Sequence, residues 1–238
     1  MDLTESEVKP KRRYDASRRR RRADEARDRI LAVARRLFLA NGYSATSLSR
    51  IADEADVSVE TIYKSLGGKA GVVRALWERA LEGSGPIPAE RRSDEMQARE
   101  TDPRRIIESW AAFVMELAPI GSPILLLART AAASDADLAE LLEKADQARA
   151  VRMEHNARGL LERGLLRGDV SLEEARDVCL VYSSAELYEL LVIRQGWPIE
   201  RYGHFVARGM MAALLPDMPP GRPIPLQRKS QDADSPTR

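Results

Sequence analysis

The residues best suited to contact another molecule lie in one short stretch, from Ser58 to Lys64. Ser58 is a favoured helix N-cap, and Ile62 and Leu66 follow four residues apart, which predicts a short helix with both side chains facing inward. Its outward positions carry Val59, Glu60, Thr61, Tyr63 and Lys64. Side chains of these types reach base edges or phosphates when a helix lies in the major groove of DNA. The stretch therefore predicts a helix that recognises DNA.

A second short helix is expected to precede this one and to set its angle. Thr46 is a favoured N-cap for it. The apolar residues that follow share one helical face: Leu48, Ile51, Ala52 and Ala55. Asp56 and Val57 interrupt this pattern. Gly67-Gly68 ends the helix that begins after Ser58, because glycine adopts the left-handed conformation of a C-cap. Two short helices that meet at a tight turn predict a helix-turn-helix.

This region resembles the N-terminal domain of the TetR family, the tetracycline-repressor-like regulators of bacterial transcription. The resemblance covers residues 28–81 and rests on RILAVARRLFLANGYSATSLSRIADEADVS, on TIY three residues after Ser58, and on Lys69, which opens the next helix. It implies that Thr46, Tyr63 and Lys69 contact DNA phosphates. The remainder of the chain carries no such motif.

Three positions depart from the residues that are usual in the family. Asp56 stands in the turn in place of Gly, Lys64 in place of His and Leu66 in place of Phe. Asp tolerates left-handed backbone geometry better than most residues, so the turn is expected to form. Lys64 predicts an altered base preference.

A run of basic residues precedes the helix-turn-helix. Residues 1–22 contain Lys9, Lys11, Arg12, Arg13 and the unbroken run Arg18 to Arg22. Adjacent like charges repel, so the sequence predicts a disordered basic arm over residues 1–22. Two interpretations remain open: a solvated tail, or an arm that follows phosphates or enters the minor groove. The position of the run directly before the first helix favours the arm.

The expected DNA contacts therefore come from the arm and from both short helices. They are Arg21, Arg22, Thr46, Ser47, Ser58, Val59, Glu60, Thr61, Tyr63, Lys64 and Lys69. The charge distribution agrees, because residues 1–80 carry an excess of Lys and Arg whereas residues 81–238 carry an excess of Asp and Glu.

The composition excludes several other classes of protein. Cys179 is the one cysteine among 238 residues, and His155 and His204 lack the spacing of metal ligands, so neither a disulfide framework nor a metal site or other cofactor is expected. No nucleophile-base pair or carboxylate pair indicates an enzyme. No uninterrupted run approaches ~18 apolar residues, and the N-terminus is charged, so we expect neither a membrane partner nor a secretory signal. Cytoplasmic localisation follows as the default.

Helical periodicity continues to residue 215, and no strand pattern is present. The sequence predicts an all-α protein with an N-terminal three-helix helix-turn-helix DNA-binding domain and a C-terminal helical ligand-binding and dimerisation domain. The expected divisions are the arm (1–22), the DNA-binding domain (23–82), a linker (83–101), the helical C-terminal domain (102–216) and a disordered Pro-rich tail (217–238).

Dimerisation is expected because a head of this kind reads one half-site, and useful specificity normally needs two. The candidate interface residues lie in the last two helical regions: Leu187, Leu191, Tyr202, Phe205, Val206, Gly209, Met210 and Ala213. The small residues Gly209 and Ala213, four apart, allow close approach of two helices. The same stripe is also compatible with plain intrachain core. The TetR resemblance favours the dimer, since the last helices of that family pair with their symmetry mates.

The resemblance also implies a small-molecule cavity in the C-terminal domain. Its expected lining is apolar with a few polar groups, the usual composition of such pockets. The candidates are Trp110, Phe113, Val114, Leu117, Leu126, Met153, Asn156 and Tyr182. Each of these side chains, taken alone, fits plain core better than a ligand contact.

These observations together predict a dimeric repressor that binds operator DNA and is released by a small, mostly apolar effector. The alternative is an effector-independent DNA-binding activator or accessory factor, in which the C-terminal domain is purely structural. Ligand occupancy and promoter response, measured separately, distinguish the two.

Overall fold

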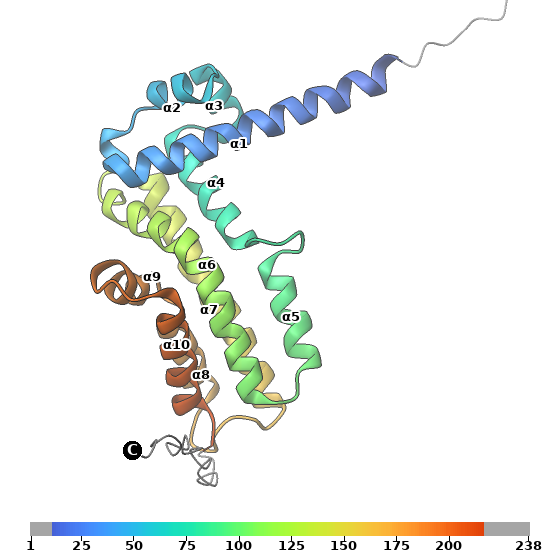
Figure 1. The fold of residues 1–238 in the computed structure, drawn as a ribbon, viewed down its shortest axis with the longest axis vertical. Helices are drawn as coiled ribbons and strands as arrows, with labels where there is room; N and C mark the ends of the chain where they lie inside the picture. The colour runs from blue at the N-terminus through green and yellow to red at the C-terminus, as the bar shows by residue number, and fades with distance from the viewer. Residues whose placement is uncertain (1–10, 217–238) are drawn as a thin grey trace, which may run out of the picture.

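The computed structural model describes residues 11–216, with side chains from residue 17, and these residues form helices without a strand among them. The predicted all-α fold is confirmed. Helices α1–α4 form a head at one end of an elongated molecule, and helices α5–α10 form a body below it (Figure 1). Residues 1–10 and the tail predicted for residues 217–238 lie outside the described residues.

The head consists of α1 (Lys11–Ala45), α2 (Leu48–Ala55), α3 (Val59–Leu66) and α4 (Lys69–Glu82). Gly42, with φ 81°, breaks the regular path of α1 near its end, where the sequence predicts a stop. Asp56 ends α2 in the left-handed conformation at φ 53°, and Gly67 ends α3 in the same way at φ 78°. The predicted helix-turn-helix is therefore present, with Asp56 in the geometry for which Gly is usual.

The disorder predicted for residues 1–22 is wrong for the part that the structure describes. Helix α1 begins at Lys11 rather than near Ala23, and Figure 1 shows it projecting beyond α2 and α3 as a continuous rod. Arginine is a good helix former, and extending an existing helix avoids the cost of nucleation. These terms outweigh the repulsion among Arg18 to Arg22, whose side chains are exposed.

The linker predicted for residues 83–101 is also wrong in part, because it contains α5 (Ala89–Arg99). Ala89, Ser93 and Gln97 recur every four residues and are buried. A stripe of small and polar side chains does not stand out in hydropathy, which explains why the sequence pattern concealed the helix. Gln97 donates from Nε2 to the Asn156 carbonyl at 3.1 Å and so ties α5 to the body.

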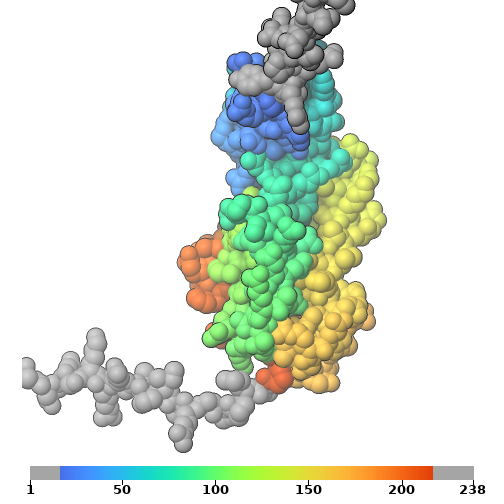
Figure 2. Space-filling model, turned by 90° about the vertical axis from the view of Figure 1, so that its right-hand side faces the viewer, coloured from blue at the N-terminus to red at the C-terminus, as the bar shows by residue number. Residues whose placement is uncertain are grey.

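The rest of the body contains α6 (Pro103–Ala131), α7 (Ala136–Glu162), α8 (Leu172–Tyr182), α9 (Ala185–Tyr188), the π-helical segment η1 (Glu189–Arg194) and α10 (Ile199–Leu214). Figure 2 shows α5 on one face of this body, beside α7. Ser171 and Glu174 form a capping box at the start of α8. Asp135 and Ser184 cap α7 and α9.

One continuous core joins the head to the body. Ile30, Phe38 and Ile51 of the head are almost fully buried in the same cluster as Ile124 of α6 and Leu138 of α7. A second cluster fills the body around Tyr202, which has no exposed surface. The head is therefore attached through apolar packing as well as through the chain connection at residues 83–88.

Helix α6 runs through the centre of the body as one helix, although the sequence suggested two. It is the one described helix long and apolar enough to cross a membrane by length and composition, with a mean hydropathy of 1.8 in its most apolar window. Buried residues along its length pack against the head and the other body helices. Its apolar composition therefore matches a central core helix.

Two prolines inside α6 open a contact with the head. Because Pro123 has no amide hydrogen, the Pro119 carbonyl lacks its donor from the next turn of the helix. Arg35 of α1 donates to that carbonyl from Nη2 at 3.4 Å. A backbone group that would otherwise stay unpaired thus becomes an attachment point between α1 and α6.

Candidate nucleic-acid interface and effector cavity

The N-terminus of α3 is exposed to solvent and capped by Ser58. Ser58 accepts a hydrogen bond at Oγ from the Thr61 amide at 3.1 Å, and the two hydroxyl oxygens lie 2.9 Å apart. Ile62 is fully buried and fixes the rotation of the helix, while Tyr63 is 58% exposed. Glu60 and Lys64 are exposed beside it, and Val59 and Thr61 are half-buried. The exposed side chains and the exposed, capped helix N-terminus form a surface of the kind that contacts the phosphates and a groove of DNA.

The assignment of Thr46 as a cap and phosphate contact is wrong. Thr46 is 1% exposed, and its hydroxyl donates to the Gly42 carbonyl at 2.9 Å. Its neighbour Ser47 caps α2 instead and accepts a hydrogen bond from the Arg50 amide at 3.1 Å. Ser47 is exposed, as a DNA contact requires, whereas the Thr46 hydroxyl serves the interior of the head.

Lys69 lies at the junction of the head and the body rather than in open solvent. Its ammonium group sits 4.2 Å from the centre of the Tyr43 ring, and Tyr43 donates from its hydroxyl to Asp135, the N-cap of α7. Burial raises the pKa of Tyr43, and the hydrogen bond to Asp135 adds to the effect. Burial also lowers the pKa of Lys69. A phosphate contact by Lys69 would therefore involve a side chain already held by the head-body junction.

Two features of this surface were not found from the sequence. Arg50 of α2 is exposed near Ser47, where it pairs with Glu54 at 3.2 Å. Gly71 allows the start of α4 to lie against the end of α3, because a Cβ at this position would fall 1.6 Å from the Leu66 carbonyl oxygen. Arg50 could have been identified from its helical position, three residues after the cap. The requirement at Gly71 depends on packing that no local pattern reveals.

The family model described as "Bacterial regulatory proteins, tetR family" matches residues 30–76, which include α2 and α3. The head of the chain therefore carries the TetR-family domain. It is 39% identical over 59 residues to the uncharacterized HTH-type transcriptional regulator YvkB of Bacillus subtilis, and 36% identical over 75 residues to the HTH-type transcriptional regulator AcrR of Shigella flexneri. These matches cover 25% and 32% of this chain and only 31% and 35% of the relatives, so they concern the head.

Solved structures extend the likeness to the whole TetR-family fold. NalD of Pseudomonas aeruginosa, described as the secondary repressor of the MexAB-OprM multidrug efflux pump, is matched at a TM-score of 0.64 and 18% identity, over 82% of this chain and 100% of that one. A complex of SmeT with triclosan is matched at a TM-score of 0.61 and 19% identity, over 85% and 99%. At these identities the likeness shows the fold alone. The family is one of transcriptional regulators and not of enzymes.

The body of this chain encloses a cavity of about 330 Å³. Six of the eight residues expected at a ligand site line it: Trp110, Phe113, Val114, Leu117, Met153 and Asn156. The other two expectations are wrong. Leu126 packs against the small cluster around Leu125, and the Tyr182 ring lies against Phe205 with centroids 5.9 Å apart. Both side chains belong to packing beside the cavity.

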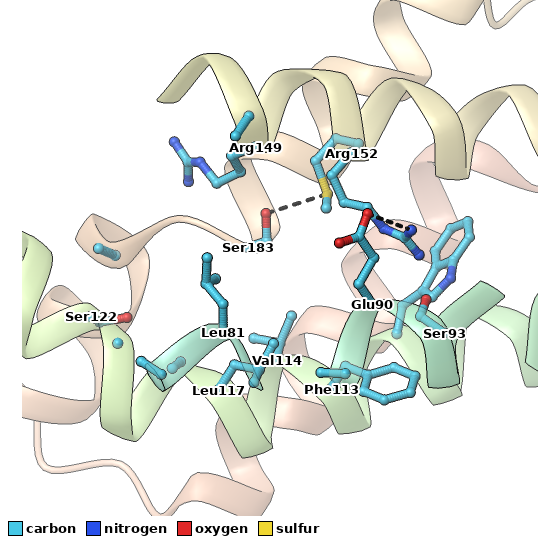
Figure 3. A pocket seen from close by; sticks show the side chains of 18 of the residues that line it. Leu81, Glu90, Ser93, Phe113, Val114, Leu117, Ser122, Arg149, Arg152 and Ser183 are labelled. Carbon is cyan, nitrogen blue, oxygen red and sulfur yellow. Dashed lines mark hydrogen bonds and ion pairs between the residues drawn. The ribbon is translucent and has the colours of Figure 1, made fainter. Parts of the chain in front are cut away.

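Polar residues that the sequence did not single out also line the cavity. They are Glu90 and Ser93 of α5, Arg149 and Arg152 of α7, Ser122 of α6, and Ser183 after α8 (Figure 3). Cys179 also lines the cavity, and burial raises the pKa of its thiol to about 12. His155 lies outside the cavity, 3.3 Å from Asp94. Among the described residues, no group of His, Cys, Asp and Glu is arranged to hold a metal ion.

The expected dimer interface needs correction, because part of it is intrachain core. Tyr202, Val206 and Met210 are at most 2% exposed within one chain, so their side chains are not accessible to a partner. Gly209 is small for an internal reason, since a Cβ there would lie 2.2 Å from Tyr182. Of the remaining candidates, Leu187, Leu191 and Ala213 are half-buried. Phe205 is exposed, and so are three further apolar residues of the last helices: Val181, Leu190 and Ile193.

Proposed function

We propose that this protein is a dimeric transcriptional repressor that binds operator DNA through its head and is released by a small molecule in the body cavity. The observation that carries the proposal is the exposed face of α3, with Tyr63 and Lys64 toward its C-terminal end and Ser58 capping its N-terminus. It lies within the residues that match the TetR family model. An operator-binding regulator of this kind acts in the cytoplasm.

The exposed apolar surface of the last helices supports dimerisation. Val181 of α8, Leu190 and Ile193 of η1, and Phe205 of α10 are each at least 39% exposed. Exposed large apolar residues on the last helices are what a surface that pairs with a second copy requires. A second copy on this surface supplies the second head that recognition of two half-sites requires.

The connections between the head and the cavity support control by an effector. Helix α7 contributes Arg149, Arg152 and Met153 to the cavity, and its N-cap Asp135 accepts the hydrogen bond from Tyr43 of the head. A ligand that shifts α6 or α7 therefore acts on the same elements that hold the head. Two structural neighbours were solved in complexes with small molecules, triclosan for SmeT and choline for a regulator from Saccharomonospora viridis.

Selection of duplexes from a random DNA library provides the test and supplies an operator for titration. We expect an enriched two-half-site sequence that the wild type binds as a dimer. Tyr63→Ala is expected to weaken binding to all duplexes by a similar factor, because phosphate contacts position a protein without reading bases. The matched control is Tyr188→Phe, which alters a buried tyrosine of the body. Absence of any enriched sequence, or unchanged affinity for Tyr63→Ala, contradicts the assignment of this face.

A further inference from the structure

Two arginines one turn apart on α7 differ in how their charge is compensated. Arg152 pairs with Asp94 at 2.6 Å and with Glu90 at 3.7 Å, so two carboxylates of α5 face one guanidinium. Figure 3 shows Glu90 reaching toward Arg152, while the Arg149 side chain extends in another direction from the same helix. Arg152 is therefore neutralised within the protein.

Among the residues that the structure describes, no other helix supplies such a partner to Arg149. Its side chain is only 25% exposed, and the carboxylate that it pairs with there is Asp146, at 3.4 Å on the same helix and 54% exposed. Its Nε is buried without a hydrogen-bond acceptor. Arg129 lies close enough to repel it, and the carboxylate nearest to Arg129 is that of Glu186, with which Arg129 is already paired. Burial lowers the pKa of Arg149, as expected for a cation that is poorly solvated.

Much of the remaining cavity wall is apolar, and Trp77 of α4 belongs to it. Leu81 of α4 and Phe113, Val114 and Leu117 of α6 lie across the cavity from α7 (Figure 3). The charged residues that line the cavity are Arg149, Arg152 and Glu90. Glu90 and Asp94 compensate Arg152, whereas Arg149 faces only Asp146, an exposed residue outside the lining. A partly buried charge that is weakly compensated is costly, and a bound counter-charge relieves that cost.

We propose that the cavity binds an apolar organic anion with a single acidic group, such as a carboxylate, that accepts hydrogen bonds from Arg149. The apolar part of the ligand lies along α6, against Phe113 and Val114. The proposal rests on the proposed effector function and specifies the chemical class of the effector. The carboxylate of Glu90 disfavours a second negative charge near Arg152, so the ligand carries one acidic group rather than two.

Three probes with one apolar body and different head groups test this class: 4-phenylbutyrate, 4-phenylbutyramide and 4-phenylbutylamine. Tryptophan fluorescence reports binding, because Trp77 and Trp110 line the cavity and Trp197 does not. Trp197→Phe removes the signal from outside it. We expect the carboxylate to bind at least about tenfold more tightly than the amide, since hydrogen bonds to charged groups contribute about 1.5–3 kcal/mol.

Variants at Arg149 locate the origin of that preference. Arg149→Gln is expected to bring the carboxylate and the amide to within about twofold of each other, and Arg149→Lys to retain most of the preference because it keeps the charge. The control is Arg158→Gln, which changes an exposed arginine of α7 that pairs with Glu154 outside the cavity. If Arg149→Gln fails to fold, the comparison of the three probes on the wild type together with Arg149→Lys decides the matter.

Several results would overturn the proposal. They are equal affinity for the carboxylate and the amide, tightest binding of the amine, a preference that survives Arg149→Gln, or no saturable binding of any probe. Titration with operator DNA, carried out in parallel, tests the proposed function independently of the ligand class. Carboxylate binding that depends on Arg149 but leaves operator affinity unchanged supports the ligand class and contradicts effector-controlled release.

Discussion

The head and the body hold their functional side chains by different means. In α2 and α3, the caps join residues three positions apart: Ser47 accepts from the amide of Arg50, and Ser58 accepts from that of Thr61. Each short helix therefore carries the cap that fixes its own exposed end. The DNA-facing surface depends mainly on local geometry, set on a small buried core.

The cavity depends on contacts between distant parts of the chain. Arg152 meets Asp94 across 58 positions, and Gln97 donates to the carbonyl of Asn156 across 59. Its walls come from α4 to α10. We therefore expect a ligand that separates these helices to change the shape of the body. The head should keep its shape and change its position relative to the body.

The largest expected effect compares how closely the chain packs around a glycine of the head, Gly71, and around a glycine of the body, Gly159. Gly71→Ala places a methyl group against the Leu66 backbone, which cannot rotate away, and we expect a loss of about 3 kcal/mol in the free energy of unfolding. Gly159→Ala meets only the end of the Gln97 side chain, so we expect a loss below about 1 kcal/mol. Urea denaturation measures both. Equal losses would contradict the contrast.

A second test addresses the helical extension of α1. Replacing Arg18, Arg20 and Arg22 by Gln keeps good helix formers while removing exposed charge. If these residues engage phosphates, the slope of log K against log salt should fall by about two to four units for the two chains of a dimer, at roughly 0.9 per contact. Operator titrations between low and moderate salt measure this slope. An unchanged slope would identify the extension as a solvated helix.

A third test concerns Glu116, which ties α6 to the chain that enters α5. The bonds from Arg92, followed by those from Ser84, hold the pKa of Glu116 at about 2 against an ordinary value of 4.5. A carboxyl group whose pKa is lowered on folding stabilises the folded state at pH values above its ordinary pKa. This contribution is lost as the pH falls to the folded-state pKa of about 2. Glu116→Gln should therefore cost about 1–2 kcal/mol near neutral pH, and less at each step below pH 4.5.

Unfolding free energies of the wild type and Glu116→Gln across this pH range measure the effect. The matched control is Glu108→Gln, at an exposed position of the same helix. A difference between wild type and Glu116→Gln that stays constant from pH 7 to pH 2 would show that the ion pair does not account for the stability.

The smallest expected effect sharpens the description of the head. Lys64→His should change the difference in binding free energy between alternative base pairs by about 1 kcal/mol at each affected position, because an ammonium and an imidazole present different donors. Binding-site selection with both proteins makes the comparison. The same preferred sequence from both would place Lys64 on phosphates.

The features of the head were largely predictable because they are local. Caps such as Ser58, the C-cap at Gly67 and the buried Ile62 follow from residue type and spacing, and the left-handed conformation at Asp56 follows from the same reasoning. Thr46 was misassigned because Thr and Ser adjoin and both suit a cap. Only the structure shows that the Thr46 hydroxyl is used inside the head.

The features of the body were predictable only where a face is plainly apolar. The α6 residues of the cavity were found, whereas Arg149, Arg152 and Glu90 resembled an ordinary solvated surface in the sequence. Likewise, the apolar stripe of α10 indicates a buried face but not whether a partner or the same chain covers it. For Tyr202 the same chain does. Such assignments depend on which helices become neighbours.

The contact between Arg35 and the Pro119 carbonyl has a consequence for which substitutions this joint tolerates. Because the acceptor is a main-chain oxygen, changing the side chain at position 119 does not remove it. A change at position 123 acts on it directly, since any other residue there supplies an amide that shares the same oxygen with Arg35. The strength of this contact between α1 and α6 therefore depends on Pro123, a residue four positions from the oxygen that accepts the bond.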